Sequence, residues 1–158
     1  MAVLFRAGHH SFNLEIFLQK KNISFVKVGG HRFVEGAHIK DLLSFLKIVA
    51  NPRDVVAWER ILRMQEGLGP KRAQEIFSLI KSQSDWPSRL EVLQGYRRLK
   101  TRLKPLTDVL NQLTEATLPP TQALEIIWSF YQTYLPRFYE EDHQRRQKEI
   151  EEIIRDAD

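Results

Sequence analysis

The chain has 158 residues, 42% of them hydrophobic and 28% charged, which is typical of one globular domain, or of one domain with a fragment of another. It contains no cysteine, which excludes disulfides, thiolate metal sites and cysteine nucleophiles. No apolar run approaches the length of a membrane span, and the first residues lack the layout of a signal peptide, so we expect a cytoplasmic protein without a membrane partner.

The net charge of +4 is unevenly distributed along the chain. Residues 1–34 carry five Lys or Arg against one acid, and residues 58–110 carry eleven against six. Residues 111–158 reverse the balance, with five basic residues and ten acids. A basic front and an acidic tail favour a polyanion that contacts one part of the surface, although ordinary solvated faces would give the same distribution.

The beginning of the chain predicts a strand, a helix and a second strand. Residues 2–5 form a continuous apolar run, which is typical of a buried strand, and residues 23–28 form another. Ser11 is expected to cap a helix between them whose inner face is Leu14, Phe17 and Leu18. This is a minimal βαβ unit, and because two strands cannot form a stable sheet alone, we expect it to be a piece of a larger domain.

From Val34 onward the periodicity is helical and no convincing strand remains. One apolar stripe predicts a helix that ends at Asn51-Pro52; its members are Ile39, Leu42, Leu43, Leu46 and Val49. Asp54 and Asp85 are expected to cap later helices, the second with Pro87 in its first turn. Pro105 predicts a break or a new first turn, and Pro119-Pro120 predicts a new start. A charged helix is expected after Pro136, with the pairs Glu141–Arg145, Asp142–Arg146 and Glu151–Arg155.

A glycine turn, Gly67-Leu68-Gly69-Pro70, separates two of these helical stripes. We expect both glycines to be free to take positive φ, the leucine to anchor the turn and the proline to begin a helix. Such a backbone leaves the first N–H groups of the next helix open to an anion, with Lys71 and Arg72 beside them. The pattern resembles a helix-hairpin-helix, which holds nucleic-acid phosphates without reading sequence; the alternative is a plain glycine C-cap followed by a helix start.

Many short blocks, in their order and spacing, resemble UvrD/Rep/PcrA-type superfamily 1 DNA helicases. Blocks similar to the second motor domain of that family are Ala2-Val3-Leu4-Phe5-Arg6, Leu14-Glu15 and Gly29-Gly30-His31-Arg32-Phe33-Val34-Glu35. Blocks similar to its helical accessory subdomain, called 2B, are Ile39-Lys40-Asp41, Asn51-Pro52-Arg53-Asp54, Arg60-Ile61-Leu62 and Gly67-Leu68-Gly69. Beyond about residue 80 only the helical pattern matches.

The chain also departs from this family at particular positions. His38 stands where the family often has an acid, and Glu66 stands where it often has a basic residue just before the glycine turn. The family's single-strand contact after the first strand is similar to Arg6 followed two residues later by a polar side chain. Here Gly8 takes the second place, so only Arg6 carries over.

The resemblance implies a mainly α fold, with residues 35–158 forming a 2B-like subdomain with a helix-hairpin-helix-like turn and residues 1–34 forming a βαβ stub from the second RecA-like motor domain. It implies a fragment of an ATP-dependent DNA helicase whose parent unwinds with 3′-to-5′ polarity and binds ATP and magnesium. The partners it implies are duplex DNA, the junction of single and double strands, and the remainder of the motor, with this region regulating unwinding. The DNA-binding residues are then Arg6, Gly67, Leu68, Gly69, Lys71 and Arg72.

The fragment itself lacks the residues for nucleotide chemistry. It has no G-x-x-x-x-G-K-[ST] loop and no acidic motif to hold magnesium, so we expect no cofactor and no ATP hydrolysis by this chain, whatever its parent does. The histidines lack metal-ligand spacing, and we expect no metal. The three tryptophans sit among apolar neighbours and are predicted to be core anchors: Trp58, Trp86 and Trp128.

A second basic stripe follows between residues 97 and 104, either facing DNA or ending a helix in solvent; its members are Arg97, Arg98, Lys100, Arg102 and Lys104. Two further functions stay open beside the helicase fragment. One is a stand-alone helix-hairpin-helix DNA-binding module, and the other is a helical protein–protein docking domain in which the glycine turn is only structural.

Overall fold

The computed structural model describes residues 2–6, 8–27, 36–96, 99–115, 117–155 and 157. This part of the chain is mainly helical and contains no strand, which confirms the predicted mainly α class. It divides into two compact units, Met1–Lys40 and Asp41–Asp158. The predicted boundary between residues 34 and 35 lies outside the described residues. None of the helices in the described ranges is both long and apolar enough to cross a membrane.

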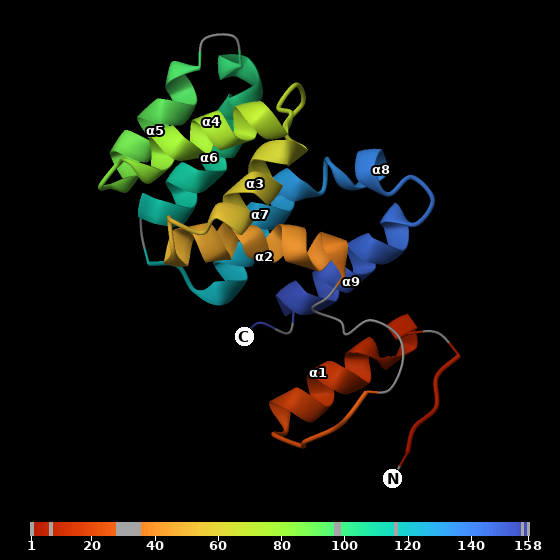
Figure 1. The fold of residues 1–158 in the computed structure, drawn as a ribbon. Helices are drawn as coiled ribbons and strands as arrows, with labels where there is room; N and C mark the ends of the chain where they lie inside the picture. The colour runs from red at the N-terminus through yellow and green to blue at the C-terminus, as the bar shows by residue number, and fades with distance from the viewer. Residues whose placement is uncertain are drawn as a thin grey trace. The chain divides into compact units, whose positions relative to one another are not determined.

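The first unit contains the 3-10 helix η1, Gly8–Ser11, and the helix α1, Phe12–Lys20 (Figure 1). The helix of the predicted βαβ stub is therefore present, but the strands are not formed over the described residues 2–5 and 23–27. The rest of the second run, Val28, lies outside the described residues. A strand needs a partner for its N–H and C=O groups, and neither run has a sheet to join within the described part of this unit.

The burial of α1 also differs from the prediction. Phe17, expected on the inner face, is 55% exposed, whereas Glu15 is 7% exposed. The carboxylate of Glu15 accepts hydrogen bonds from Ser11 Oγ at 2.5 Å and Lys27 Nζ at 2.6 Å. Ser11 therefore does not cap the helix with its side chain; its hydroxyl binds Glu15 instead. No strand among the described residues of this unit covers Phe17, so this part of the apolar face of α1 keeps contact with solvent.

The helices α2, Ala37–Ala50, and α3, Val55–Met64, meet at the predicted Asn51-Pro52 stop. Asp54 caps α3 as predicted, because its Oδ1 accepts a hydrogen bond from the N–H of Ala57 at 3.0 Å. The buried stripe of α2 differs in part from the prediction. Leu43, Leu46 and Val49 are half-buried, and the fully buried members are Ile39, Leu42, Phe45 and Ile48.

The next three helices are α4, Pro70–Lys81, α5, Trp86–Gly95, and α6, Lys100–Glu115. Asp85 caps α5 as predicted, accepting from the N–H of Ser88 at 2.9 Å. The break or new first turn predicted at Pro105 is wrong, because α6 begins at Lys100 and runs through Pro105. Pro105 is exposed and lies near the start of the helix, so it removes a single hydrogen bond, to the carbonyl of Thr101, without a packing clash in the core.

The last helices are α7, Pro120–Tyr131, α8, Leu135–Phe138, and α9, His143–Arg155. Pro120 begins α7, as predicted. The charged helix follows Pro136, as predicted; it is α9, which begins at His143 after the short helix α8. Of its expected ion pairs, Asp142–Arg146 forms at 2.8 Å, while Arg145 pairs with Asp142 at 2.6 Å and with Glu149 at 3.6 Å rather than with Glu141.

In the second unit each helix from α3 to α6 packs against the next one in the chain, and α9 packs on α7 and α8. Figure 1 shows α4 and α5 side by side, and α6 packs against α5. The tryptophans contribute unequally to this core. Trp58 is fully buried, with its ring centroid 6.2 Å from that of Trp86, while Trp86 and Trp128 are half-buried.

A buried carboxylate joins elements that are distant in sequence. Asp41 on α2 accepts hydrogen bonds from Arg60 Nη1 on α3 at 2.6 Å and from the Tyr131 hydroxyl on α7 at 2.7 Å. The Tyr139 hydroxyl lies 3.3 Å from Oδ2 of Asp41, the atom that also accepts from Tyr131. Asp41 is 6% exposed, so these donors satisfy a charge that burial would otherwise make costly. The network therefore fixes α2 against both α3 and α7.

Candidate nucleic-acid interface

Residues 65–69 connect α3 to α4 and include the first three residues of the glycine turn, while Pro70 begins α4. Buried side chains hold this connection in place. The N–H of Leu68 donates to the carbonyl of Gln65 at 3.2 Å, and the Leu68 side chain is 5% exposed. Gln65 is itself buried, and its Oε1 accepts from the Tyr134 hydroxyl at 3.0 Å. Leu68 therefore anchors the turn, as its place between the glycines predicts. The buried Leu68 and Gln65 side chains hold the exposed glycines in position.

Gly67 has the backbone conformation that requires glycine. Its φ is +79°, in the left-handed region where a side chain is strained. The space above its Cα is also taken, since a Cβ built there would lie 2.7 Å from Nη1 of Arg102. A side chain at this position would therefore be strained by the backbone and would also have to displace the guanidinium of Arg102.

Gly69 differs from the prediction. Its φ is −74° and its ψ is 169°, an extended conformation that other residues adopt, so the expectation of positive φ at both glycines is wrong here. A Cβ built on Gly69 would meet no atom within 4 Å. The chain itself thus places no demand for glycine at this position, and the surface beside it is open.

The helix α4 begins directly after Gly69 with Pro70 at its first position and no side chain capping it. The first intrahelical bond runs from the N–H of Ala73 to the carbonyl of Gly69 at 3.0 Å. The N–H groups of Lys71 and Arg72 belong to the first turn, where a helix offers no carbonyl acceptor. Both side chains are exposed, so two cations and two donors share one helix end.

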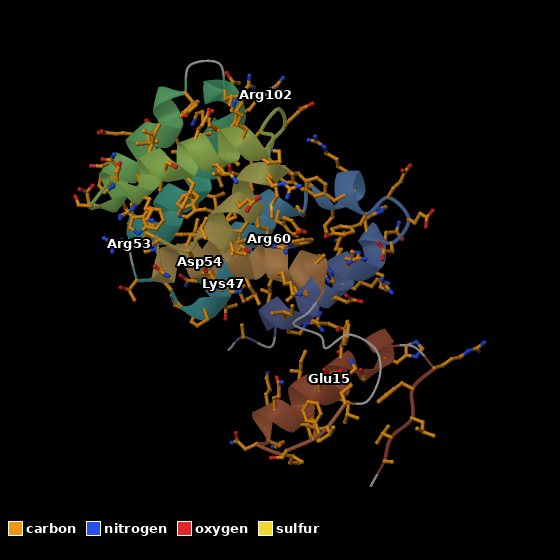
Figure 2. All side chains as sticks on the ribbon, in the orientation of Figure 1. Glu15, Lys47, Arg53, Asp54, Arg60 and Arg102 are labelled. Atoms are coloured by element: carbon orange, nitrogen blue, oxygen red, sulfur yellow. The ribbon has the colours of Figure 1, made fainter. Side chains whose placement is uncertain are left out.

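Two arginines from different helices lie against this turn. Arg72 Nη1 donates to the carbonyl of Gly67 at 3.3 Å, and Arg102 Nη1 donates to the carbonyl of Glu66 at 3.3 Å. Figure 2 shows Arg102 at the top of the unit, where α6 begins. The carbonyls of adjacent residues therefore hold one guanidinium each, and both side chains remain exposed. The acidic side chain of Glu66 is exposed beside them.

The structure brings one member of the predicted second stripe to the glycine turn. Lys104 instead pairs with Asp108 on its own helix, at 2.8 Å. Arg97, Arg98 and the side chain of Lys100 lie outside the described residues. The proximity of Arg102 to the turn could not be anticipated, because 36 residues separate Arg102 from Glu66 and no local pattern links them.

Arg6 belongs to the first unit, where its side chain is exposed. The other predicted contacts all lie in the second unit: Gly67, Leu68, Gly69, Lys71 and Arg72. A role in DNA binding stays a prediction for each of these residues.

Comparison with known proteins shows the family to which this chain belongs. The family described as UvrD-like helicase C-terminal domain matches residues 1–155. Over 77 residues the chain is 39% identical to a protein named ATP-dependent DNA helicase PcrA from Staphylococcus epidermidis, a segment that covers 48% of this chain and 11% of that protein. It is 38% identical over 77 residues to the protein of the same name from Staphylococcus aureus, covering 48% of this chain and 10% of that one.

The curated relatives are therefore much longer than this chain, which aligns with about a tenth of their length. The family match, in contrast, extends over nearly all of it. The chain belongs to the UvrD-like helicase C-terminal domain family.

Proposed function

We propose that this chain is a fragment of an ATP-dependent DNA helicase in which residues 35–158 form a 2B-like accessory subdomain and residues 1–34 form part of the second motor domain. The family match over residues 1–155 supports the helicase origin, as does the name of the relatives, ATP-dependent DNA helicase PcrA. The exposed apolar side chains of the first unit support the second assignment, because they are the residues that a complete sheet would cover; examples are Val3, Leu4, Phe17 and Val26.

The glycine turn is the surface that contacts duplex DNA in this proposal. The observation that carries it is the open space beside Gly69, next to the uncapped start of α4 and the exposed Lys71 and Arg72. A phosphate can approach the backbone there and accept hydrogen bonds from first-turn N–H groups, with the helix dipole favouring its charge. These groups reach phosphates and leave base edges alone, so the contact positions the duplex without reading its sequence.

In the parent helicase this contact would hold duplex beside the junction of single and double strands and so regulate unwinding. The hydrophobic base of the turn, Leu68, and its link through Gln65 to Tyr134 would transmit force from the duplex to the rest of the subdomain. Arg6 would contact single-stranded DNA from the motor side.

ATP and magnesium belong to the parent and not to this chain. The sequence has no G-x-x-x-x-G-K-[ST] loop, and the described residues contain no cluster of three or more acidic or histidine side chains that could hold a metal ion. The residues present do not fit a nucleotide site, and no step of ATP hydrolysis is assigned to them.

The proposal is tested by titrating the wild-type chain with duplex DNA of two unrelated sequences at two salt concentrations. We expect weak binding that is equal for the two sequences. Each phosphate contact should contribute about 0.9 to the negative slope of log K against log salt. Single-stranded DNA of the same length is the control for recognition of the duplex form. A strong preference for one sequence, or affinity that does not depend on salt, would contradict phosphate contact.

A helical protein–protein docking domain is the second candidate. One observation favours it: Arg72 and Arg102 both donate to main-chain carbonyls of the turn, as arginines of a purely structural turn would. Absence of duplex binding by the wild-type chain would favour this candidate. The stand-alone DNA-binding module differs from the helicase fragment only in the parent, so a reading frame with nucleotide and magnesium motifs upstream would decide between those two.

A further inference from the structure

We propose that Arg102 on α6 is a third phosphate-contacting cation of the glycine turn. We also propose that the position of its guanidinium against Glu66 and Gly67, called its seat below, is one reason why residue 67 is glycine. The phosphate contact rests on the proposed function, whereas the seat does not.

Two distances to Nη1 of Arg102 define this position. Arg102 Nη1 lies 3.3 Å from the carbonyl oxygen of Glu66. The same nitrogen would lie 2.7 Å from a Cβ on Gly67, and Leu99 Cδ2 would lie 3.9 Å from that Cβ. Leu99 is 6% exposed, and its buried side chain borders the same space. The guanidinium therefore occupies the volume that a side chain at position 67 would need.

This seat leaves Arg102 able to bind an anion. A guanidinium carries five N–H donors, and the contact with Glu66 uses one of its nitrogens, while the side chain as a whole is exposed. Arg72 is held in the same manner by the adjacent carbonyl, that of Gly67. An anchored arginine loses less conformational freedom on binding than a free one, so both are better prepared than Lys71 to hold a phosphate.

Arg102 also offsets the negative charge that Glu66 places at the turn. Glu66 is exposed and places a negative charge beside the first turn of α4, where a phosphate would be repelled. Arg102 brings a positive charge to the main chain of the same residue from another helix. Glu66, Lys71, Arg72 and Arg102 together then carry a net charge of +2 at the turn, which suits a phosphodiester.

The phosphate contact is tested by comparing Arg102→Ala with Lys104→Ala in the duplex titration. Lys104 is the matched control, because it lies on the same helix, carries the same charge and pairs with Asp108 on that helix. We expect Arg102→Ala to weaken binding and to lower the salt slope by about 0.9, one contact, with a much smaller change for Lys104→Ala. An unchanged slope for Arg102→Ala, or equal losses in the two variants, would overturn the contact.

The seat is tested without DNA by a double-mutant cycle in the free energy of unfolding, using Gly67→Ala, Arg102→Ala and the double variant. The strain of positive φ is present in both variants that carry the Gly67→Ala change, so it cancels. We expect the double variant to be more stable than the sum of the single changes, because the new methyl group then meets no guanidinium. If Gly67→Ala does not fold alone, recovery of folding in the double variant is the equivalent result, and failure of both variants to fold counts against the seat.

The two experiments separate the possible failures. Additive changes in the cycle reject the seat of Arg102. Wild-type binding with an unchanged Arg102→Ala slope rejects only the third contact. Absence of duplex binding by the wild-type chain rejects the proposed function and the contact together, while a non-additive cycle still retains the seat.

Discussion

Arg102 on α6 donates a hydrogen bond to the carbonyl of Glu66, 3.3 Å away, although 36 residues separate them in the chain. The bond joins α6 to the turn between α3 and α4. It brings Arg102, from the predicted basic stripe of residues 97–104, to the surface where Lys71 and Arg72 lie. Arg72 reaches that surface from α4 by the same kind of contact. The charge at the turn therefore depends on tertiary packing as well as on the local sequence.

The two glycines of the turn should respond differently to substitution. Gly69→Ala is expected to leave the fold intact, at a cost below about 1 kcal/mol, because its φ of −74° suits alanine and the new Cβ meets nothing. It should nevertheless weaken duplex binding by narrowing the approach of a phosphate. Gly67→Ala should lower the melting temperature because of its φ of +79°. Thermal unfolding and duplex titration of both variants check this; equal destabilisation by the two would contradict it.

Removing the acid beside the turn should strengthen binding. Glu66→Gln removes the repulsion, and Glu66→Arg adds a cation, while the main-chain carbonyl that holds Arg102 remains. We expect tighter duplex binding for both, with the salt slope steeper by about 0.9 only for the arginine variant. Glu91→Gln, which removes an exposed acid from α5, is the control and should change affinity less. If all three variants bind alike, the turn does not face DNA.

The Asp41 network should contribute to the stability of the second unit. Tyr131→Phe removes a donor from a buried carboxylate and is expected to cost about 1–3 kcal/mol of unfolding free energy. Tyr139→Phe should cost less, because its contact is longer, 3.3 Å against 2.7 Å, and its side chain is only half-buried. Chemical denaturation of the two variants measures the difference. A larger loss for Tyr139→Phe would show that the hydrogen bond to Tyr131 is not the stronger one.

Alkaline pH should destabilise the chain through its buried phenols. Burial, followed by the charge of Asp41, raises the pKa of Tyr131 above its ordinary value of 10.0, and burial also raises the pKa of Tyr134 and Tyr139. Above pH 10 the unfolded chain would release these protons while the folded chain keeps them, so the unfolding free energy should fall as pH rises. Denaturant midpoints measured below and above pH 10 check this. The Tyr131→Phe variant should lose less unfolding free energy over the same rise in pH. A flat profile would contradict it.

Sequence reasoning succeeded where the cause is local. Asp54 and Asp85 cap their helices because a carboxylate binds a backbone N–H three residues ahead, which spacing alone reveals. It also found the chain segment of the turn, with Leu68 as its anchor. These features need no knowledge of what packs against them.

It failed where a distant partner decides the outcome. Residues 2–5 have the composition of a buried strand, but a strand forms only when another strand satisfies its backbone, and none does so in the described part of the first unit. Pro105 predicts a break or a new first turn, yet α6 runs through it. The positive φ expected at Gly69 occurs only at Gly67, and the seat of Arg102 depends on how α6 packs.

The most direct measurement is the salt dependence of duplex binding by the Lys71→Ala/Arg72→Ala double variant. A matched control is Lys47→Ala/Arg53→Ala, which also removes one exposed lysine and one exposed arginine, from positions that Figure 2 shows well apart from Arg102. We expect the double variant at the turn to keep its helical content but to bind more weakly, with a slope lowered by up to about 1.8, two contacts, and the control to change much less. Unchanged affinity and slope at the turn would contradict the account and favour a docking domain.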